Sequence, residues 1–277
     1  MAGPLDGRVI FMSGGSRGIG LAIATRAARD GARVALMAKT AEPHPKLPGT
    51  VYTAAHEIQT AGGDALPIVG DIRDADAVDS AVAQTVERFG GIDIVVNNAS
   101  AINLSPMRDL EVKRYDLMQQ INARGTFVVT KACLSQLRES DHAHVLTLSP
   151  PLSADAKWLV GNSAYTLSKM GMTMLTLGVA ADEAAAGVGA NCLWPRTIIA
   201  TAAVQNLLGG DATMARARTP EIMGDAAHAI LNRSPSEVTG RCFIDDEALA
   251  EAGITDLGGY SEPDADLALD LFVEDWA

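Results

Sequence analysis

Short apolar segments alternate with helical segments over most of this chain, and this alternation limits the possible folds more than any other feature. Strands of a parallel sheet are continuous apolar runs, because helices cover both faces of the sheet. Repeated strand–helix–strand units join such strands through right-handed crossovers. We therefore expect an α/β domain, a doubly wound parallel sheet flanked by helices. Strands are expected at 9–13, 33–38, 65–69, 92–96, 144–148, 189–193 and 241–244, and helices at 18–30, 54–61, 75–89, 107–138, 163–186 and 220–231.

The charge distribution separates this domain from an acidic tail. Residues 245–277 contain 11 acidic residues and no Lys or Arg, so the formal net charge of −12 belongs mainly to the tail. We expect one domain over 1–244 and an acidic C-terminal tail over 245–277. One interpretation is a solvated, partly disordered tail. Packing on a neighbouring subunit or near the mouth of the functional site is favoured, because Phe272 and Trp276 gain by burial.

Several classes of protein are disfavoured by composition. The negative charge argues against a nucleic-acid partner. No apolar run is long enough to cross a bilayer, and the first residues lack the features of a leader peptide, so a cytoplasmic protein without a membrane span is expected. Cys133, Cys192 and Cys242 are widely spaced, which favours reduced thiols over a metal site.

A glycine-rich turn follows the first expected strand and opens the first expected helix. Gly14, Gly18 and Gly20 have the spacing G-x-x-x-G-x-G. Such a turn lets the backbone approach a pyrophosphate closely, while the helix N-terminus offers free N–H groups to the anion. A purely structural turn is the alternative, but the strand–turn–helix context favours dinucleotide binding by a Rossmann-like domain.

The end of the second strand indicates which dinucleotide is bound. An acidic residue there would hold a ribose 2′-hydroxyl, whereas a basic one would accept a 2′-phosphate. This chain has Lys39 at that place and Arg17 in the glycine turn. The two cations favour NADP(H), although Lys39 could also be a solvated lysine at a strand end.

Tyr165 and Lys169 are separated by four positions in an expected helix. They would lie on one face, with the ammonium beside the phenol. A nearby positive charge favours the phenolate, so we expect a lowered pKa for Tyr165 and a role in proton transfer. The pair could be an ordinary amphipathic pair on a helix, but the glycine turn favours catalysis.

These residues resemble the short-chain dehydrogenase/reductase family. The resemblance covers about residues 8–244. Five motifs occur in the family's order: Ser13–Gly20, Asn97-Asn98-Ala99-Ser100, Asn122, Tyr165-Thr-Leu-Ser-Lys169 and Asn191…Pro195.

The resemblance implies a role for each matching residue. Tyr165 would be the general acid/base, Lys169 would hold the nicotinamide ribose, and Asn122 would hold a water that passes protons. Ile198 would offer its backbone N–H to the nicotinamide carboxamide. The remaining cofactor residues would hold the pyrophosphate, adenine and ribose: Gly14, Ser16, Arg17, Gly18, Ile19, Gly20, Asp71 and Asn98.

Residues 38–55, 148–152 and 193–197 resemble a narrower group of the family, in which a sterol-carrier domain follows the reductase domain in animals. The 277 residues include no such segment, so a reductase domain alone is expected. Members of the family commonly form tetramers through the helices at 107–138 and 163–186. A homo-oligomer, dimer or tetramer, is therefore implied.

Two positions depart from the family pattern. The usual catalytic serine lies thirteen residues before the tyrosine, where this chain has Leu152; Ser149 is the favoured substitute, and Ser153 or no serine at all are the alternatives. Arg196 replaces a usual glycine. It could meet an anionic substrate or pair with an acid.

We therefore expect an NADP(H)-dependent oxidoreductase that interconverts a carbonyl and an alcohol. The mostly apolar segment 198–208 favours a hydrophobic or lipid-like small-molecule substrate. One alternative is a dinucleotide-binding sensor or scaffold with little turnover, and another is an enoyl-thioester reductase.

Overall fold

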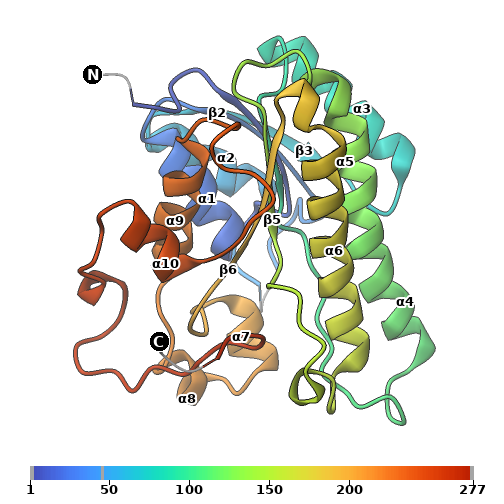
Figure 1. The fold of residues 1–277 in the computed structure, drawn as a ribbon, viewed down its shortest axis with the longest axis vertical. Helices are drawn as coiled ribbons and strands as arrows, with labels where there is room; N and C mark the ends of the chain where they lie inside the picture. Colours follow the sequence, from blue (N-terminus) through green and yellow to red (C-terminus); the bar gives the residue numbers. More distant parts are fainter. Residues whose placement is uncertain (1–2, 45–46, 275–277) are drawn as a thin grey trace.

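The computed structural model describes residues 3–44 and 47–274. Its centre is a seven-stranded sheet with the order β3-β2-β1-β4-β5-β6-β7, and each pair of neighbouring strands is parallel (Figure 1). The α/β fold predicted from the alternating pattern is confirmed. The strands are β1 (Val9–Ser13), β2 (Arg33–Ala38), β3 (Asp64–Val69), β4 (Ile94–Asn97), β5 (His144–Leu148), β6 (Gly189–Trp194) and β7 (Cys242–Ile244).

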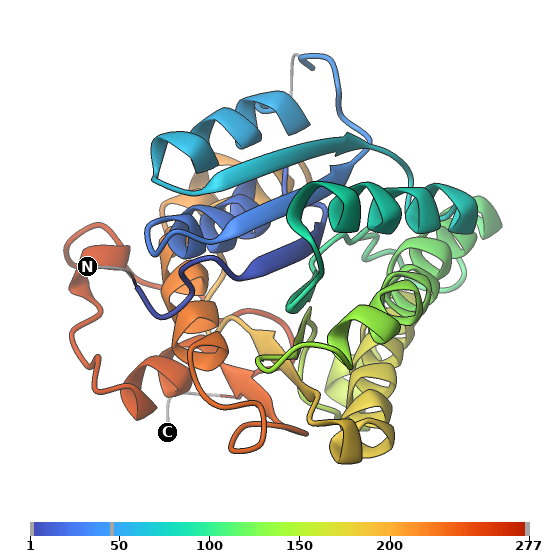
Figure 2. The same ribbon diagram turned by 90° about the horizontal axis from the view of Figure 1, so that it is seen from above.

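Two layers of helices cover the sheet, one on each face (Figure 2). Successive strand residues point to opposite faces, so Ile10 and Met12 join one buried cluster while Phe11 joins the other. Complete burial of a side chain such as Phe11 stabilises the fold by about 2 kcal/mol. The first layer contains α1 (Gly18–Ala28), α2 (Val51–Thr60), α9 (Glu221–Leu231) and α10 (Asp245–Glu251); the second contains α3 (Ala75–Phe89), α5 (Ala123–Leu137) and α6 (Ser163–Asp182).

The expected helix over 107–138 is wrong: the structure has α4 (Val112–Ile121) and α5, with Asn122 between them. Asn122 has φ −73° and ψ −80°, outside the helical region. Its side chain bonds both backbone groups of Ala101 and the Ser168 hydroxyl. These partners are far away in sequence, so the local pattern did not reveal the break.

Helix α2 begins at Val51, three residues earlier than expected. Thr50 caps it, since its hydroxyl accepts from Thr53 N–H while the Thr53 hydroxyl accepts from Thr50 N–H. This reciprocal arrangement satisfies two backbone donors that would otherwise lack partners. The prolines at 43 and 48 lie before this cap, so they do not prevent the helix from starting at Val51.

Beyond β6 the chain forms shorter elements. The segment after Trp194 makes isolated bridges from Thr197 to Leu269 and from Ile199 to Arg218. In the part of the chain described, no helix is both long and apolar enough to cross a membrane. The shorter elements beyond β6 include α7 (Ala202–Leu207), α8 (Asp211–Met214) and the 3₁₀ turn Gly258–Tyr260, and two further 3₁₀ turns, Ala156–Trp158 and Ala184–Ala186, lie before β6.

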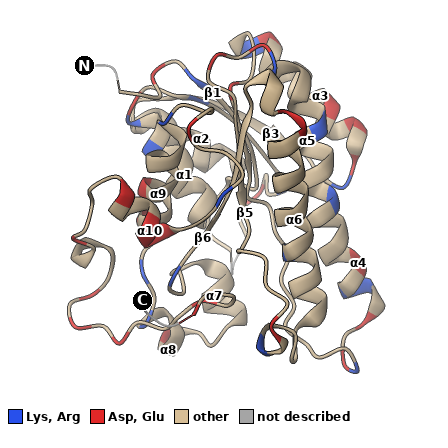
Figure 3. Ribbon diagram, viewed as in Figure 1, with Lys and Arg blue, Asp and Glu red and all other residues tan. Residues whose placement is uncertain are grey.

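The region predicted as an acidic tail contributes to the folded molecule. Leu249 of α10 is fully buried, in the same core cluster as residues of α9. Three acidic residues occupy the first turn of α10, where the helix dipole favours negative charge (Figure 3). Phe272 and Val273 are buried, while Trp276 lies outside the described residues.

Candidate active site

At two positions of the glycine turn after β1, there is no room for any side chain larger than that of glycine. Gly14 has φ +78°, and a Cβ there would lie 2.7 Å from the Cα of Ala99. A Cβ on Gly20 would lie 2.5 Å from the side-chain nitrogen of Asn98, which donates to Gly14 O at 2.8 Å. The ends of β1 and β4 are therefore in direct contact, and Asn98 fixes the shape of the turn.

The N-terminus of α1 offers unpaired backbone donors to this region. Arg17 is its N-cap residue but makes no capping hydrogen bond, and the first turn holds no acid. Instead the Arg17 guanidinium donates to Pro48 O and Gly49 O, at 2.8 and 2.7 Å. The free N–H groups of a helix start attract anions, so the turn fits a pyrophosphate.

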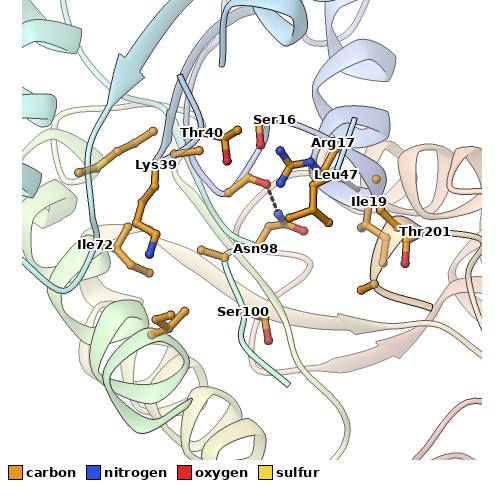
Figure 4. A pocket seen from close by; sticks show the side chains of 18 of the residues that line it. Ser16, Arg17, Ile19, Lys39, Thr40, Leu47, Ile72, Asn98, Ser100 and Thr201 are labelled. Atoms are coloured by element: carbon orange, nitrogen blue, oxygen red, sulfur yellow. Dashed lines mark hydrogen bonds between the residues drawn. The ribbon is translucent and has the colours of Figure 1, made fainter. Parts of the chain in front are cut away.

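A cavity of about 590 Å³ lies along the turn, and we call it the glycine-turn cavity. Figure 4 shows Arg17, Lys39 and Asn98 arranged around it, from three different strand ends. Eight of the predicted cofactor residues line it: Gly14, Ser16, Arg17, Gly18, Ile19, Lys39, Asp71 and Asn98.

A second cavity of about 900 Å³, the tyrosine cavity, is lined by Tyr165, Lys169 and Ile198. Because the two cavities share wall residues, they adjoin one another. A ligand extended from the glycine turn would reach the tyrosine. The shared residues are Ile19, Asn98, Ser100, Thr201 and Ala203.

Cations surround the far end of the glycine-turn cavity. Lys39 Nζ lies 3.7 Å from the Asp71 carboxylate, and Arg73 bonds the same carboxylate at 2.6 Å. The hydrogen bond from Arg73 is the main reason that the pKa of Asp71 is lowered. Asp71 therefore stays ionised between Lys39 and Arg73, while Arg17 lines another part of the cavity (Figure 4).

Tyr165 and Lys169 lie on one face of α6, as their spacing predicted. Both are buried, and Lys169 Nζ donates to Leu148 O at 2.8 Å. Burial lowers the pKa of Lys169 to about 7, against the charge of Asp270. The predicted lowering of the Tyr165 pKa is wrong in this structure: burial raises it, and Asp270 raises it further. Desolvation penalises the charged phenolate form of a buried tyrosine.

The other predicted catalytic residues do not line either cavity. Asn122 is fully buried and bonded to Ala101 and Ser168. Ser149 is also fully buried, and its oxygen accepts from Thr173 at 2.9 Å. The structure therefore does not bring Ser149 to the tyrosine cavity. Gly20 lies under Asn98 rather than in a cavity wall.

Leu152 and Ser153 do not supply the missing hydroxyl. Leu152 is exposed, and the Ser153 hydroxyl accepts from Asp155 N–H. Among the described residues of the loop after β5, Lys157 and Trp158 line the tyrosine cavity, and neither has a hydroxyl. No serine of this loop lines the cavity in this structure.

The C-terminal segment forms one wall of the tyrosine cavity, which is one of the two positions that the sequence favoured for it. Ile198 N–H donates to Ala268 O, and Asp270 N–H donates to Arg196 O, both at 2.9 Å. Trp194 Nε1 donates to Leu271 O at 2.7 Å. The segment thus runs alongside the chain that follows β6 and is joined to it by these hydrogen bonds and one isolated antiparallel bridge. Its wall residues are Leu269, Asp270, Leu271, Val273 and Glu274.

This arrangement answers two questions left open by the sequence. The N–H of Ile198 is bonded to Ala268, so it is not free for a carboxamide here. Arg196 pairs with Asp246 and Glu247, at 2.8 and 2.6 Å, rather than with a substrate. A tail beside the functional site was one of two predicted positions. Its signal was the expected gain from burying Phe272 and Trp276, and Phe272 is buried in the structure.

With this geometry established, similarity to known proteins places the chain in a family. Residues 8–210 match the family model for short chain dehydrogenase, so the chain belongs to that family. The resemblance drawn from the five motifs is confirmed. Family members are oxidoreductases that bind nicotinamide dinucleotides, and the turn and cavities described above fit such a cofactor.

Curated relatives narrow the resemblance to one group. The chain is 49% identical over 274 residues to hydroxysteroid dehydrogenase-like protein 2 of Xenopus tropicalis and 46% identical over 275 residues to that of Homo sapiens. Each alignment covers 99% of this chain but 65% of the relative. The chain therefore spans just under two thirds of these relatives.

Two solved structures have folds that closely match the fold of this chain. A crystal structure from Xanthomonas campestris has a TM-score of 0.94 at 54% identity, covering 98% of this chain and 99% of that one. A short chain dehydrogenase from Mycobacterium thermoresistibile has a TM-score of 0.93 at 57% identity, covering 98% and 96%.

Proposed function

We propose that this protein is an NADP(H)-dependent oxidoreductase that interconverts a carbonyl and an alcohol, with Tyr165 as the general acid/base. The observation that carries the proposal is the adjoining pair of cavities: one holds the glycine turn, and the other holds Tyr165 and Lys169. A dinucleotide bound at the turn would extend toward the tyrosine.

The bound nicotinamide supplies or accepts the hydride. Because its pKa is raised, Tyr165 keeps its proton at neutral pH and can donate it to the oxygen of a reduced carbonyl. Lys169 lies one turn further along α6, and its ammonium donates to Leu148 O at the end of β5. This bond holds the ammonium beneath the cavity, where it would orient the cofactor ribose.

Charge favours NADP(H) over NAD(H). Lys39 and Arg17 both line the glycine-turn cavity, and Lys39 shares its acidic partner Asp71 with Arg73. A 2′-phosphate would find cations there, while no acid stands in the place that holds a 2′-hydroxyl in NAD-specific proteins.

The walls of the tyrosine cavity favour an apolar substrate. Trp158 lies in this wall and packs on Phe272, with 5.7 Å between ring centroids. Further apolar wall residues come from separate parts of the chain and include Ile102, Leu104, Trp194, Ile199, Leu208 and Leu271. The relatives' name, hydroxysteroid dehydrogenase-like, is compatible with such a substrate.

Exposed apolar side chains on α5 and α6 support a homo-oligomer. Phe127, Leu167 and Met174 are 48%, 56% and 64% exposed. Large apolar side chains gathered on neighbouring helices are typical of association surfaces.

Replacement of Tyr165 by Phe tests the proposal. It removes the proton donor while keeping the ring, so we expect kcat for NADPH-dependent ketone reduction to fall about 10²- to 10⁴-fold. NADPH affinity, followed by fluorescence, should stay within about threefold, because the contacts of the glycine turn remain.

Tyr115→Phe on the exposed side of α4 is the matched control and should keep full activity. Unchanged turnover in Tyr165→Phe would contradict the assigned role. A wild type that binds NADPH but reduces no ketone would instead favour a dinucleotide sensor.

A further inference from the structure

Asp270 brings a carboxyl group into the tyrosine cavity from the C-terminal segment. It lines the same cavity as Tyr165 and Lys169, and its charge acts on both groups. Within the described chain, its carboxyl accepts a single hydrogen bond, from Leu271 N–H to Oδ1 at 2.6 Å. The second oxygen, Oδ2, is left for a ligand.

The backbone around Asp270 is held in place on both sides. Its N–H donates to Arg196 O, and Leu271 O accepts from Trp194 Nε1. The ring of Phe272 packs against Trp158, Tyr165 and Trp194, with centroids 5.7, 6.2 and 5.9 Å apart. The carboxyl therefore belongs to a packed wall, and little entropy is lost when it binds a ligand.

The loop after β5 contributes no hydroxyl to the tyrosine cavity: Ser149 bonds Thr173, Ser153 bonds Asp155 N–H, and neither is among its wall residues. Apart from Tyr165, the hydroxyls among the described wall residues belong to Ser100 and Thr201, which this cavity shares with the glycine-turn cavity. A carbonyl bound near Tyr165 has a second lone pair that requires a donor. Asp270 lines the tyrosine cavity together with Tyr165 and Lys169. Glu274, the other carboxyl among the described wall residues, pairs with Lys157 at 2.8 Å.

We propose that Asp270 contacts the substrate and, together with Tyr165, holds the reacting oxygen. When protonated, it donates to a carbonyl oxygen; when ionised, it accepts from an alcohol O–H. The substrate class that fits is a neutral ketone or alcohol on an apolar skeleton, because an anionic group beside the reacting carbon would meet the Asp270 charge. This inference rests on the proposed oxidoreductase function.

The surroundings allow Asp270 to change its protonation near neutral pH. Burial raises its pKa to about 7, Lys169 opposes this shift, and Asp245 of α10 adds to it. The pKa of Asp245 is itself raised, to about 6, mainly by burial. Below pH 7 the donor form of Asp270 predominates and assists reduction. Above pH 7 the acceptor form assists alcohol oxidation.

The test compares Asp270→Asn with Asp270→Ala, using the alicyclic ketone that the wild type reduces fastest in a panel from cyclohexanone to steroid ketones. Asn keeps a donor at every pH, so reduction should stay within about tenfold. The Asp270 ionisation should vanish from the pH profile, and the remaining ionisation, that of Lys169, should move below pH 7 because the Asp270 charge that raises its pKa is gone. Ala removes the donor, and kcat should fall about 10²-fold. NADPH affinity should be unchanged in both.

Asp266→Asn is the control, since that side chain is 88% exposed in the same segment. If Asp270→Ala has the same kcat as the control and keeps the wild-type pH profile, the inference is overturned. If kcat falls equally in Asp270→Asn and Asp270→Ala, Asp270 does not act as a hydrogen-bond donor to the substrate. If Ala fails to fold, the pH profile of Asp270→Asn decides. A wild type that reduces no ketone refutes the underlying function instead.

Discussion

The two ends of the site are built in different ways. The glycine-turn cavity is lined by residues that directly follow β1, β2, β3 and β4. The tyrosine cavity combines α6 and the chain after β6 with a segment from the C-terminus. Local sequence motifs therefore define the first end, whereas hydrogen bonds between distant segments define the second.

The two ends of the site should also respond differently to amino-acid substitutions. At the glycine turn, backbone atoms of Ala99 leave no space beside Gly14, so any side chain there must displace the main chain. In the tyrosine cavity, one ring, that of Phe272, packs against three others. Substitutions at the first end should abolish cofactor binding, while those at the second should alter substrate use.

The largest effect is expected from Gly14→Val. The new side chain would meet Ala99 at 2.7 Å and require a positive φ that valine rarely adopts. NADPH binding, measured by fluorescence titration, should weaken more than 100-fold. Gly259→Ala is the control, because no atom lies within 4 Å of its Cβ position. Normal NADPH affinity in Gly14→Val would remove the basis for the glycine-turn cavity as the cofactor site.

A smaller and different effect is expected from Phe272→Ala. Loss of a buried ring should lower the free energy of unfolding by about 3 kcal/mol. The wall that contains Asp270 should loosen, raising the KM for ketones at least tenfold while NADPH affinity stays within threefold. Thermal unfolding and steady-state kinetics measure the two effects. If NADPH affinity falls as much as ketone affinity, the two ends do not behave as separate units.

The smallest effect is expected from Lys39→Ala. Loss of one cation should weaken NADPH binding about tenfold, or about 1.4 kcal/mol, and leave NADH binding unchanged. The comparison of both dissociation constants is the measurement, with Lys131→Ala on α5 as the control. Equal affinities for NADPH in the variant and the wild type would show that Lys39 does not select the cofactor.

Prediction from the sequence succeeded for elements whose structure depends on residues close together along the chain. The strands over 9–13, 33–38 and 144–148 agree with the structure because continuous apolar runs specify buried strands. It did not predict the break between α4 and α5 at Asn122, because that break depends on hydrogen bonds with the distant residues Ala101 and Ser168. It placed Ser149 in the site because it follows β5, but a strand end does not fix the direction of a side chain.

The sequence by itself determined the parallel sheet, the glycine turn and the pairing of Tyr165 with Lys169, because spacing along one strand or helix fixes which side chains share a face. Tertiary structure alone decided that the C-terminal segment closes the tyrosine cavity and that Asp270 lies beside Lys169. It also reversed the expected direction of the Tyr165 pKa. Burial and charge depend on everything packed around a group, and distant segments of the chain supply most of those neighbours.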